Sequence, residues 1–460
     1  MIKVRWLALA IAISLLLDAC NIPKKDFTCD DLPTSANSQV SQSDTINLAI
    51  HVDGSGSMLG YVANDTSRYV QTLELLDRTI ALGGSSSKST IEYYRTGKGS
   101  KKITRSDFRK AQKPEFYDGS NPQFPDVASG LATAITPSQK GEQLFVMVSD
   151  LDQDGGDVTN LNQKIKETYL NQQKKGYAVG IVAIRSEFQG KVYIADKTRQ
   201  DFSYDTEGKK NENLRPFYVM FLGPYQDIAN YFEKLKREGG QVLDGSQFMI
   251  LSPNNIVSEI SYLSSPEQPL PQDLKQPSSL NDGQVAIEVN DDKKNQLLEI
   301  EKDSSQELPI NYKVAFTSLS HTLPIDASSI ESTFKIKVFD RFNKQFEEKS
   351  NDQSLKSFLK FSDWQIDNNN KTLSFVTKIS PSQVSQPGVY LFTVDVTAKN
   401  LQDPAWWKEW DFDPKRDKTD DGSKTNNLVN FLRGLKTITT ELMQDDPPMI
   451  GHFCYAIQKN

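Results

Sequence analysis

The strongest constraint on the fold is an apolar run, Ile46–Val52, that ends abruptly in the polar sequence Asp-Gly-Ser-Gly-Ser at residues 53–57. A short continuous hydrophobic segment bounded by glycine and polar residues predicts a strand buried on both faces. Open α/β sheets bind ligands at the loops that leave the carboxyl ends of such strands. The side chains of Asp53, Ser55 and Ser57 therefore converge at one strand end. Their oxygens suit a hard divalent cation that keeps some of its waters, which is Mg²⁺, with Mn²⁺ or Ca²⁺ as alternatives.

The spacing Asp53-x-Ser55-x-Ser57 after a buried strand resembles the metal-ion-dependent adhesion site of von Willebrand factor type A (VWA) domains. In that family a second loop supplies a Thr, and a third loop supplies an Asp after another buried strand. Asp150 follows the apolar run Leu144–Ser149 and matches the third loop. The resemblance implies that the serine hydroxyls hold the ion directly and that Asp53 and Asp150 hold it largely through water. One coordination position would be left for an acidic residue of a protein partner.

The second loop departs from the family pattern. Pro125 and Asp126 stand where the Thr is expected, at the start of a predicted helix over 126–135. The sequence leaves three alternatives open: Asp126 replaces the Thr, Ser129 replaces it, or the site is weakened. A directly coordinating Asp126 would add negative charge and reduce the attraction of the ion for an acidic partner.

Strands and helices alternate between residues 45 and 263, which predicts an α/β domain with a doubly wound, mostly parallel sheet, as the VWA resemblance also implies. The segment 91–96 has the alternation of an edge strand, and 191–214 is interpreted as a hairpin-like insertion. The predicted strands are 46–52, 91–96, 143–148, 177–184, 216–223 and 247–251, and the predicted helices lie at 69–80, near 160–173 and at 228–235.

A proline-rich segment, 264–280, follows this domain and predicts an extended linker. From 281 to 460 the pattern changes to short alternating apolar runs, which predict a mainly antiparallel β-sandwich. Tyr390 in one of these runs resembles the strand-entry tyrosine of immunoglobulin-like domains, whose hydroxyl caps a backbone turn. The stripe of apolar residues at 428–442 predicts a helix and 453–457 a closing strand, and we place both in this second domain.

The N-terminus has the composition of a secretory signal. Lys3 and Arg5 precede an apolar stretch, 6–17, that is too short for a comfortable membrane span. The ending Leu-Asp-Ala-Cys at 17–20 resembles a bacterial lipobox, although its Asp is unusual there. We therefore expect a signal peptide over 1–20, lipidation of Cys20, and a tether over 21–44 that holds the protein on the bacterial cell envelope, facing the periplasm or the exterior.

The chain has three cysteines. With Cys20 lipidated, Cys29 and Cys454 are left, and in an oxidising compartment they form either one disulfide or two free thiols. A disulfide would require the N-terminal segment to pack beside the strand at 453–457. Zinc is not expected in a chain with so few cysteines and only three histidines.

Composition and missing motifs exclude other functions. The formal net charge of −7 argues against nucleic-acid binding, and the basic cluster Lys98–Lys102 is interpreted as a solvated loop. The loop 150–155 lacks the twelfth-position acid of an EF-hand, because that residue is Leu161. His51 is expected to be a buried, hydrogen-bonded side chain, and the Trp cluster at 406–410 an anchor for its own domain.

We therefore expect no enzymatic activity. The nucleophile-elbow pattern Gly-x-Ser-x-Gly is not met around Ser55, because Ser57 stands where glycine is needed. The sequence favours a lipid-anchored, extracytoplasmic protein-binding module, for adhesion or envelope scaffolding, that depends on Mg²⁺. The alternative is a metal-free structural scaffold of the envelope, and a periplasmic hydrolase has the least support.

Overall fold

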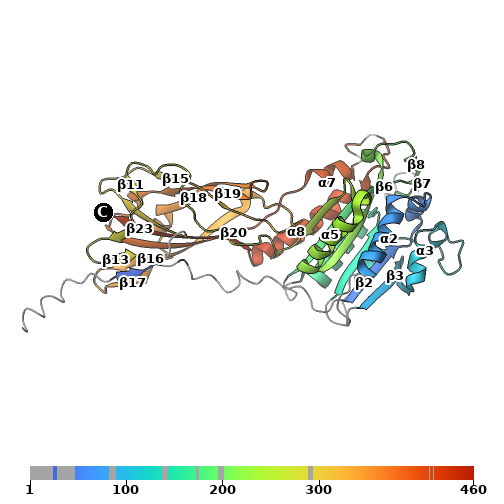
Figure 1. The fold of residues 1–460 in the computed structure, drawn as a ribbon, viewed down its shortest axis with the longest axis horizontal. Helices are drawn as coiled ribbons and strands as arrows, with labels where there is room; N and C mark the ends of the chain where they lie inside the picture. The colour runs from blue at the N-terminus through green and yellow to red at the C-terminus, as the bar shows by residue number, and fades with distance from the viewer. Residues whose placement is uncertain are drawn as a thin grey trace, which may run out of the picture.

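The computed structural model describes residues 24–27, 29, 47–81, 90–136, 143–171, 176–194, 201–288, 294–413, 415–417 and 419–460. The expected signal peptide, with Cys20, and most of the expected tether lie outside these residues. Within them, no helix combines the length and the apolar character that a membrane crossing requires. The molecule is elongated, with a helix-covered sheet at one end and a strand-rich body at the other (Figure 1).

The first sheet has seven strands in the order β10-β6-β9-β5-β2-β3-β4. Strand β2 is parallel to both β3 and β5, whereas β9 is antiparallel to both of its neighbours, β5 and β6. The sheet is therefore mixed, and not mostly parallel as expected. Its strands are β2 (Asn47–Asp53), β3 (Thr90–Thr96), β4 (Ser100–Ile103), β5 (Gln143–Ser149), β6 (Tyr177–Ser186), β9 (Arg215–Pro224) and β10 (Gln247–Leu251).

The antiparallel direction of β9 follows from the connection before it. A parallel neighbour needs a crossover, which is usually a helix, but β6 is followed by the small hairpin of β7 (Gln189–Val192) and β8 (Phe202–Asp205). The chain therefore returns directly, and β9 runs back along β6. The hairpin expected at 191–214 is present.

The last strand at one edge of the first sheet also differs from the prediction, because it is β4 and not β3. Strand β3 covers the predicted edge segment, but β4 pairs with it and forms the actual edge. The lysines of β4 lie within the basic cluster that we interpreted as a loop, and their side chains are exposed. Exposed lysines on an edge strand hinder pairing with another chain, so they suit this position.

Helices cover both faces of the first sheet because the side chains of each buried strand alternate between two apolar layers. Leu144 and Val146 of β5 pack in the cluster that contains Leu73 of helix α2 (Arg68–Ala81) and Phe232 of helix α5 (Tyr225–Gly239). Phe145 packs in the opposite layer with side chains of α4 (Gly155–Ile165) and α8 (Leu428–Asp445).

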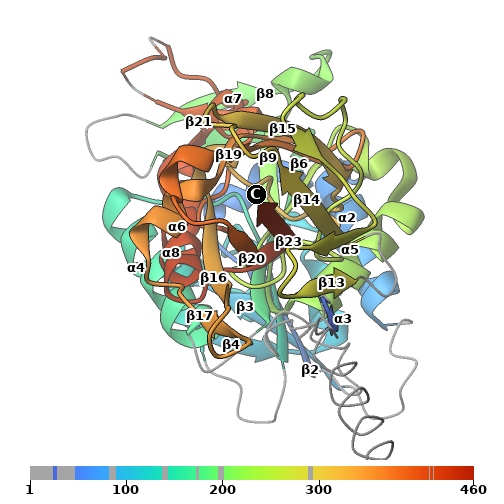
Figure 2. The same ribbon diagram turned by 90° about the vertical axis from the view of Figure 1, so that its left-hand side faces the viewer.

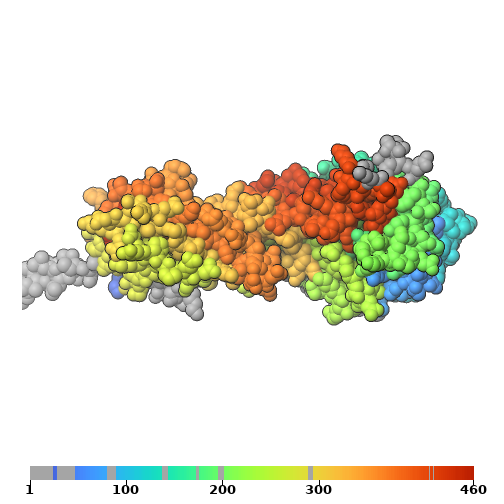
Figure 3. Space-filling model, turned by 90° about the horizontal axis from the view of Figure 1, so that it is seen from above, coloured from blue at the N-terminus to red at the C-terminus, as the bar shows by residue number. Residues whose placement is uncertain are grey.

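The position of α8 corrects our expectation that the C-terminal helix belongs to the sandwich. The chain leaves the strand-rich body, returns to the first sheet as α7 (Ala405–Trp410) and α8, and then goes back. Asn162 Nδ2 of α4 donates to the Phe431 carbonyl of α8 at 3.2 Å. Figure 3 shows these C-terminal residues, in red, beside the green surface of the first sheet. The helical stripe was visible in the sequence, but not the surface that it covers.

The Trp cluster anchors this return segment to the first sheet. Trp406, Trp407 and Trp410 are buried in α7. Trp407 Nε1 donates to the sulfur of Met249 in β10 at 3.4 Å, and the guanidinium of Arg185 in β6 lies 4.4 Å from the ring centre of Trp410. The cluster is therefore an anchor, as expected, but for the other sheet.

The strand-rich body packs a six-stranded sheet, β11-β14-β23-β20-β16-β17, against a three-stranded sheet, β15-β19-β18. Tyr455 of β23 contacts Tyr312 of β15, and its hydroxyl is 2.9 Å from Thr377 of β19. The hydroxyl of Tyr390 donates to the Gln386 carbonyl at 2.6 Å, four residues upstream. The strands are β11 (Leu274–Lys275), β14 (Asn295–Ile300), β15 (Leu308–Ala315), β16 (Ile330–Asp340), β17 (Gln345–Glu348), β18 (Leu359–Asp367), β19 (Thr372–Ile379), β20 (Gly388–Ala398) and β23 (Met449–Lys459).

The expected tether and linker both contribute to this body. Strand β1 (Lys24–Asp26) pairs with β13 (Ala286–Glu288), which also pairs with β12 (Ser279–Asn281). Strands β11 and β12 lie within the proline-rich segment 264–280 or at its end, so that segment packs against the sheet. A disulfide joins Cys29 to Cys454 across a Cα–Cα distance of 5.7 Å. Figure 2 shows β14, β23 and β20 side by side at this end.

The remaining elements are short and lie in connections. They are η3 (Gly56–Val62), α3 (Arg105–Lys110), η4 (Pro114–Phe116), η5 (Leu131–Ala134), η6 (Lys166–Leu170), η7 (Asn211–Asn213), η8 (Gly240–Leu243), η9 (Ala327–Ser329), α6 (Gln353–Phe358), η10 (Pro381–Gln383), β21 (Asp411–Phe412) and β22 (Thr425–Asn426).

Candidate metal centre

Asp53 is the centre of a polar cluster at the carboxyl ends of β2 and β5. Its side chain is fully buried. One carboxylate oxygen accepts the Ser55 backbone N–H at 3.0 Å, and the other accepts the hydroxyls of Ser149 at 2.9 Å and Ser129 at 3.1 Å. Three separate segments of the chain therefore bring hydroxyl or carboxylate oxygens to one point.

The loop after β2 is held in one conformation. The hydroxyls of Ser55 and Ser57 are 3.1 Å apart, so these oxygens are neighbours, as the spacing predicted. Gly54 is required there, because a Cβ atom on it would lie 2.5 Å from Nε of Arg95. The guanidinium of Arg95 donates to the Gly54 carbonyl at 2.8 Å, and the Gly54 N–H donates to the Thr96 carbonyl at 2.8 Å.

The second loop supplies Ser129 and not Asp126. The predicted helix over 126–135 is wrong: residues 125–130 have no regular secondary structure, and the short 3-10 turn η5 follows them. Gly130 packs directly on the carbonyl of Gly97, where a Cβ atom would lie 2.5 Å from the oxygen. The neighbouring Ser129 donates its hydroxyl to Asp53, while the Asp126 side chain is exposed. Of the three alternatives, the structure brings Ser129 to the cluster.

The third loop carries a buried ion pair that the sequence did not reveal. Asp150 is 1% exposed, and its carboxylate accepts a hydrogen bond from Arg215 Nη2 at 3.4 Å. The same guanidinium nitrogen is 3.7 Å from a carboxylate oxygen of Asp152. Leu151 between them has a φ of 54°, an unusual backbone conformation for a leucine that marks a tightly determined turn. Arg215 also donates to the Gly422 carbonyl at 3.3 Å.

The other acidic residue of this loop has a different role. Asp154 caps helix α4, since its carboxylate accepts the Asp157 backbone N–H at 2.8 Å. The acidic loop therefore divides its carboxylates between a helix cap and the buried cluster.

The charges of the cluster do not balance. Burial raises the pKa of Asp53, and the negative charge of Asp150 raises it further, while hydrogen bonds from Ser55 and Ser149 oppose the shift. The side chains of Asp53, Asp150 and Asp152 are all nearly inaccessible. Arg215 is the cation beside Asp150 and Asp152, and the buried guanidinium of Arg95 interacts electrostatically with Asp53. With all three carboxylates ionised, the two guanidiniums leave a formal charge of −1. A cation would offset this excess of negative charge, and carboxylate and hydroxyl oxygens are the donors that Mg²⁺ and Ca²⁺ prefer.

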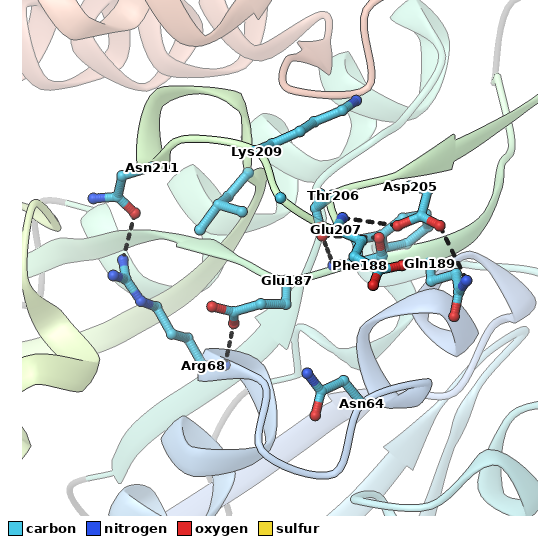
Figure 4. Close-up of a pocket in the computed structure, with 12 residues that line it drawn as sticks. Asn64, Arg68, Glu187, Phe188, Gln189, Asp205, Thr206, Glu207, Lys209 and Asn211 are labelled. Carbon is cyan, nitrogen blue, oxygen red and sulfur yellow. Dashed lines mark hydrogen bonds between the residues drawn. The ribbon is translucent and has the colours of Figure 1, made fainter.

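A polar cavity lies beside the cluster, between the start of α2 and the β7–β8 hairpin (Figure 4). Its volume is about 500 Å³. The Glu187 carboxylate accepts the Arg68 backbone N–H at 2.8 Å, and the Arg68 guanidinium donates to Asn211 at 2.7 Å. Phe188 lines the cavity and lies 5.2 Å from the Arg215 guanidinium, so one residue contacts both the cavity and the ion pair.

His51 belongs to the core of the sheet. It is 4% exposed, stacks on Tyr94, contacts Phe145 at a tilt, and places Nδ1 3.2 Å from the Thr96 hydroxyl. Burial lowers its pKa to about 3, so the ring is neutral at physiological pH. It is a buried, hydrogen-bonded histidine, as expected.

No protein-family model matches the chain, and a search of the curated proteins gives no match. The geometry and charge of the cluster are therefore the basis for its proposed function.

Proposed function

We propose that the chain is a protein-binding module of the bacterial cell envelope, anchored by a lipid on Cys20, whose VWA-like first domain binds Mg²⁺ at the Asp53 cluster. The immunoglobulin-like second body would hold this domain away from the membrane. The observation that carries the proposal is the excess of negative charge: three buried carboxylates face two guanidiniums, those of Arg215 and Arg95, beside adjacent hydroxyls. Burial of unbalanced charge is unfavourable unless a counter-ion is present.

Each side chain has a separate role in this proposal. The hydroxyls of Ser55, Ser57 and Ser129 would be direct ligands, and Asp53 and Asp150 would act largely through water. The ion would offer its positive charge to an acidic side chain of the partner. Neutral hydroxyl ligands favour this, because they leave more of the charge of the ion for the partner than carboxylate ligands would. Arg215 holds Asp150 and Asp152 in place, as their contacts show.

Calorimetric titration with Mg²⁺ tests the proposal. We expect one bound Mg²⁺ per chain, and Mg²⁺ should also raise the midpoint of thermal unfolding. Asp53→Asn should abolish both effects. Asp126→Asn is the matched control, because it removes an exposed carboxylate from the same edge without changing a contact of Asp53. A wild-type chain with no heat of binding and no thermal shift would contradict the metal site.

A metal-free envelope scaffold is the second candidate, and Arg215 favours it. Its guanidinium already supplies one positive charge between Asp150 and Asp152, so the cluster has a resident cation. The two candidates differ in one capture experiment, in which envelope proteins retained by the chain are compared with Mg²⁺ and with a chelator. Retention that is lost in the chelator supports the ion-dependent module, and unchanged retention supports the scaffold.

A further inference from the structure

The disulfide at the far end of the molecule lies beside a histidine. One ring nitrogen of His452 and the sulfurs of Cys29 and Cys454 all lie within 4.8 Å of one another, and the three residues are buried. His452 and Cys454 are two residues apart on β23 and therefore share one face of that strand. These ligand atoms are close enough to share a metal ion once the sulfurs are no longer bonded to each other.

His452 is oriented as metal-binding histidines are. Its Nδ1 lies 2.6 Å from a carboxylate oxygen of Asp395, the residue opposite it on β20. A proton on Nδ1 donates to this carboxylate and leaves a lone pair on Nε2. Nε2 is buried, and within the described part of the chain it has no hydrogen-bond partner. A histidine that donates one ring N–H to a carboxylate and presents the other nitrogen is the usual second-shell arrangement of a metal site.

Asn295 provides a second unused acceptor at the same place. It lies opposite Cys454 in the register of β14 and β23. Its Nδ2 donates to the Phe27 carbonyl at 3.4 Å, on the segment that carries Cys29. Its Oδ1 is buried and, among the residues that the structure describes, has no hydrogen-bond partner. Two unsatisfied acceptors beside one disulfide are unusual, because buried polar atoms are normally paired.

We propose that reduction of the Cys29–Cys454 disulfide creates a Zn²⁺ site formed by the two thiolates, His452 Nε2 and Asn295 Oδ1. In the reduction, a dithiol transfers two electrons: its two thiols become a disulfide, the Sγ–Sγ bond breaks, and each cysteine sulfur gains a proton. Binding of Zn²⁺ then displaces both thiol protons to solvent. Two thiolates and neutral ligands balance the charge of Zn²⁺, which suits a buried site, and four donors match its tetrahedral preference.

The placement of the ligands gives the site a structural purpose. His452, Cys454 and Asn295 lie on neighbouring strands within the six-stranded sheet, whereas Cys29 lies on the N-terminal segment after β1. Zinc would therefore reconnect the N-terminal segment to the sheet after the covalent link has been reduced. The oxidised chain keeps its sulfurs in the disulfide and binds no ion there.

Zinc titration of the oxidised and reduced full chain tests the proposal. The chain carries Cys20→Ser, so Cys29 and Cys454 are its only thiols. After reduction the dithiol is removed under anaerobic conditions, and Zn²⁺ is added in competition with a chromophoric chelator. We expect one Zn²⁺ per reduced chain, none in the oxidised chain, and Co²⁺ charge-transfer absorption in the reduced chain alone. Zn²⁺ should also raise the unfolding midpoint of the reduced chain.

Variants separate a built site from thiols that bind zinc without the fold. His452→Ala should weaken Zn²⁺ binding at least about tenfold, and Asp395→Asn should weaken it by about 10-fold through the lost second-shell contact. His321→Ala is the matched control, because this histidine pairs with Glu233 elsewhere, and it should leave the affinity unchanged. If His452→Ala does not fold, Asp395→Asn provides the same test. Equal affinity in the reduced parent and these variants, or no zinc binding after reduction, would overturn the proposal.

Discussion

Two clusters of aspartate and arginine on the first sheet use the same residue types in opposite environments. At the carboxyl end of β5, Arg215 contacts Asp150 and Asp152, and the three side chains are between 1% and 5% exposed. Charges in this position have lost almost all of their hydration. They are favourable only as a set, because removal of one partner leaves the others buried without compensation.

On α2, Asp77 is bridged by two arginines of α3, Arg105 at 2.7 Å and Arg109 at 3.1 Å. The aspartate side chain is 9% exposed, but the arginines are about half-exposed, at 46% and 59%. Water therefore screens these charges, and either arginine can be solvated when its partner is lost. The comparison predicts that the burial of the arginine, not the number of contacts, decides how much an ion pair contributes to stability.

The largest effect should follow from Arg215→Met, which keeps the volume and removes the charge. We expect it to destabilise the fold by about 3–5 kcal/mol, because it leaves the buried carboxylates uncompensated. Chemical denaturation measures the change. Arg105→Met is the control on the exposed cluster and should cost less than about 1 kcal/mol. Similar losses in the two variants would remove the distinction between the clusters.

Asp150→Asn should have the next largest effect. The amide keeps the shape of the side chain but weakens its hydrogen bond with Arg215, which still faces Asp152. We expect a loss of about 1.5–3 kcal/mol in the free energy of unfolding, the range for a hydrogen bond to a charged group. A stability equal to that of the wild type would show that Asp152 alone compensates Arg215.

The contact between Arg215 and Asp150 could not be predicted from the sequence. The strands and the helical stripes of the first domain were predictable, because runs of apolar residues must be buried. We expected β9 to be parallel to β5. Its first residue would then lie at the opposite end of the strands from Asp150. The antiparallel direction of β9 instead brings that residue to the cluster. One feature of the sequence indicates the antiparallel direction: a hairpin, and no crossover helix, lies between β6 and β9.

The second loop was mispredicted for a related reason. The segment 126–135 has helix-forming residues, but Gly130 makes a close contact with the backbone of Gly97, more than thirty residues earlier. Local sequence carries no information on such a contact, and tertiary packing overrides propensity. The choice between Asp126 and Ser129 therefore needed the structure. The placement of α8 on the first sheet is a third long-range feature of this kind.

A smaller effect is expected for Asp77→Asn on the exposed cluster. The substitution removes the charge that Arg105 and Arg109 share, but both arginines keep access to water. We expect a loss of about 0.5–1 kcal/mol, measured by the same denaturation assay as Asp150→Asn. A loss larger than that of Asp150→Asn would reverse the ranking of the two clusters.

The smallest effect is the pH dependence of the Asp77 contribution. Burial would raise the pKa of Asp77, but hydrogen bonds from Arg105 and Arg109 outweigh it and hold the pKa below the usual value of 3.8. Because the folded pKa is lower than the unfolded one, the ion pair stabilises the fold above about pH 4 and loses this contribution as the pH falls through the folded pKa. The stability difference between wild type and Asp77→Asn should therefore be constant from about pH 8 to 5 and shrink by a few tenths of a kcal/mol towards about pH 3. Denaturation curves over this range measure it, and a difference that grows on acidification would mean that the arginines do not stabilise the ionised carboxylate.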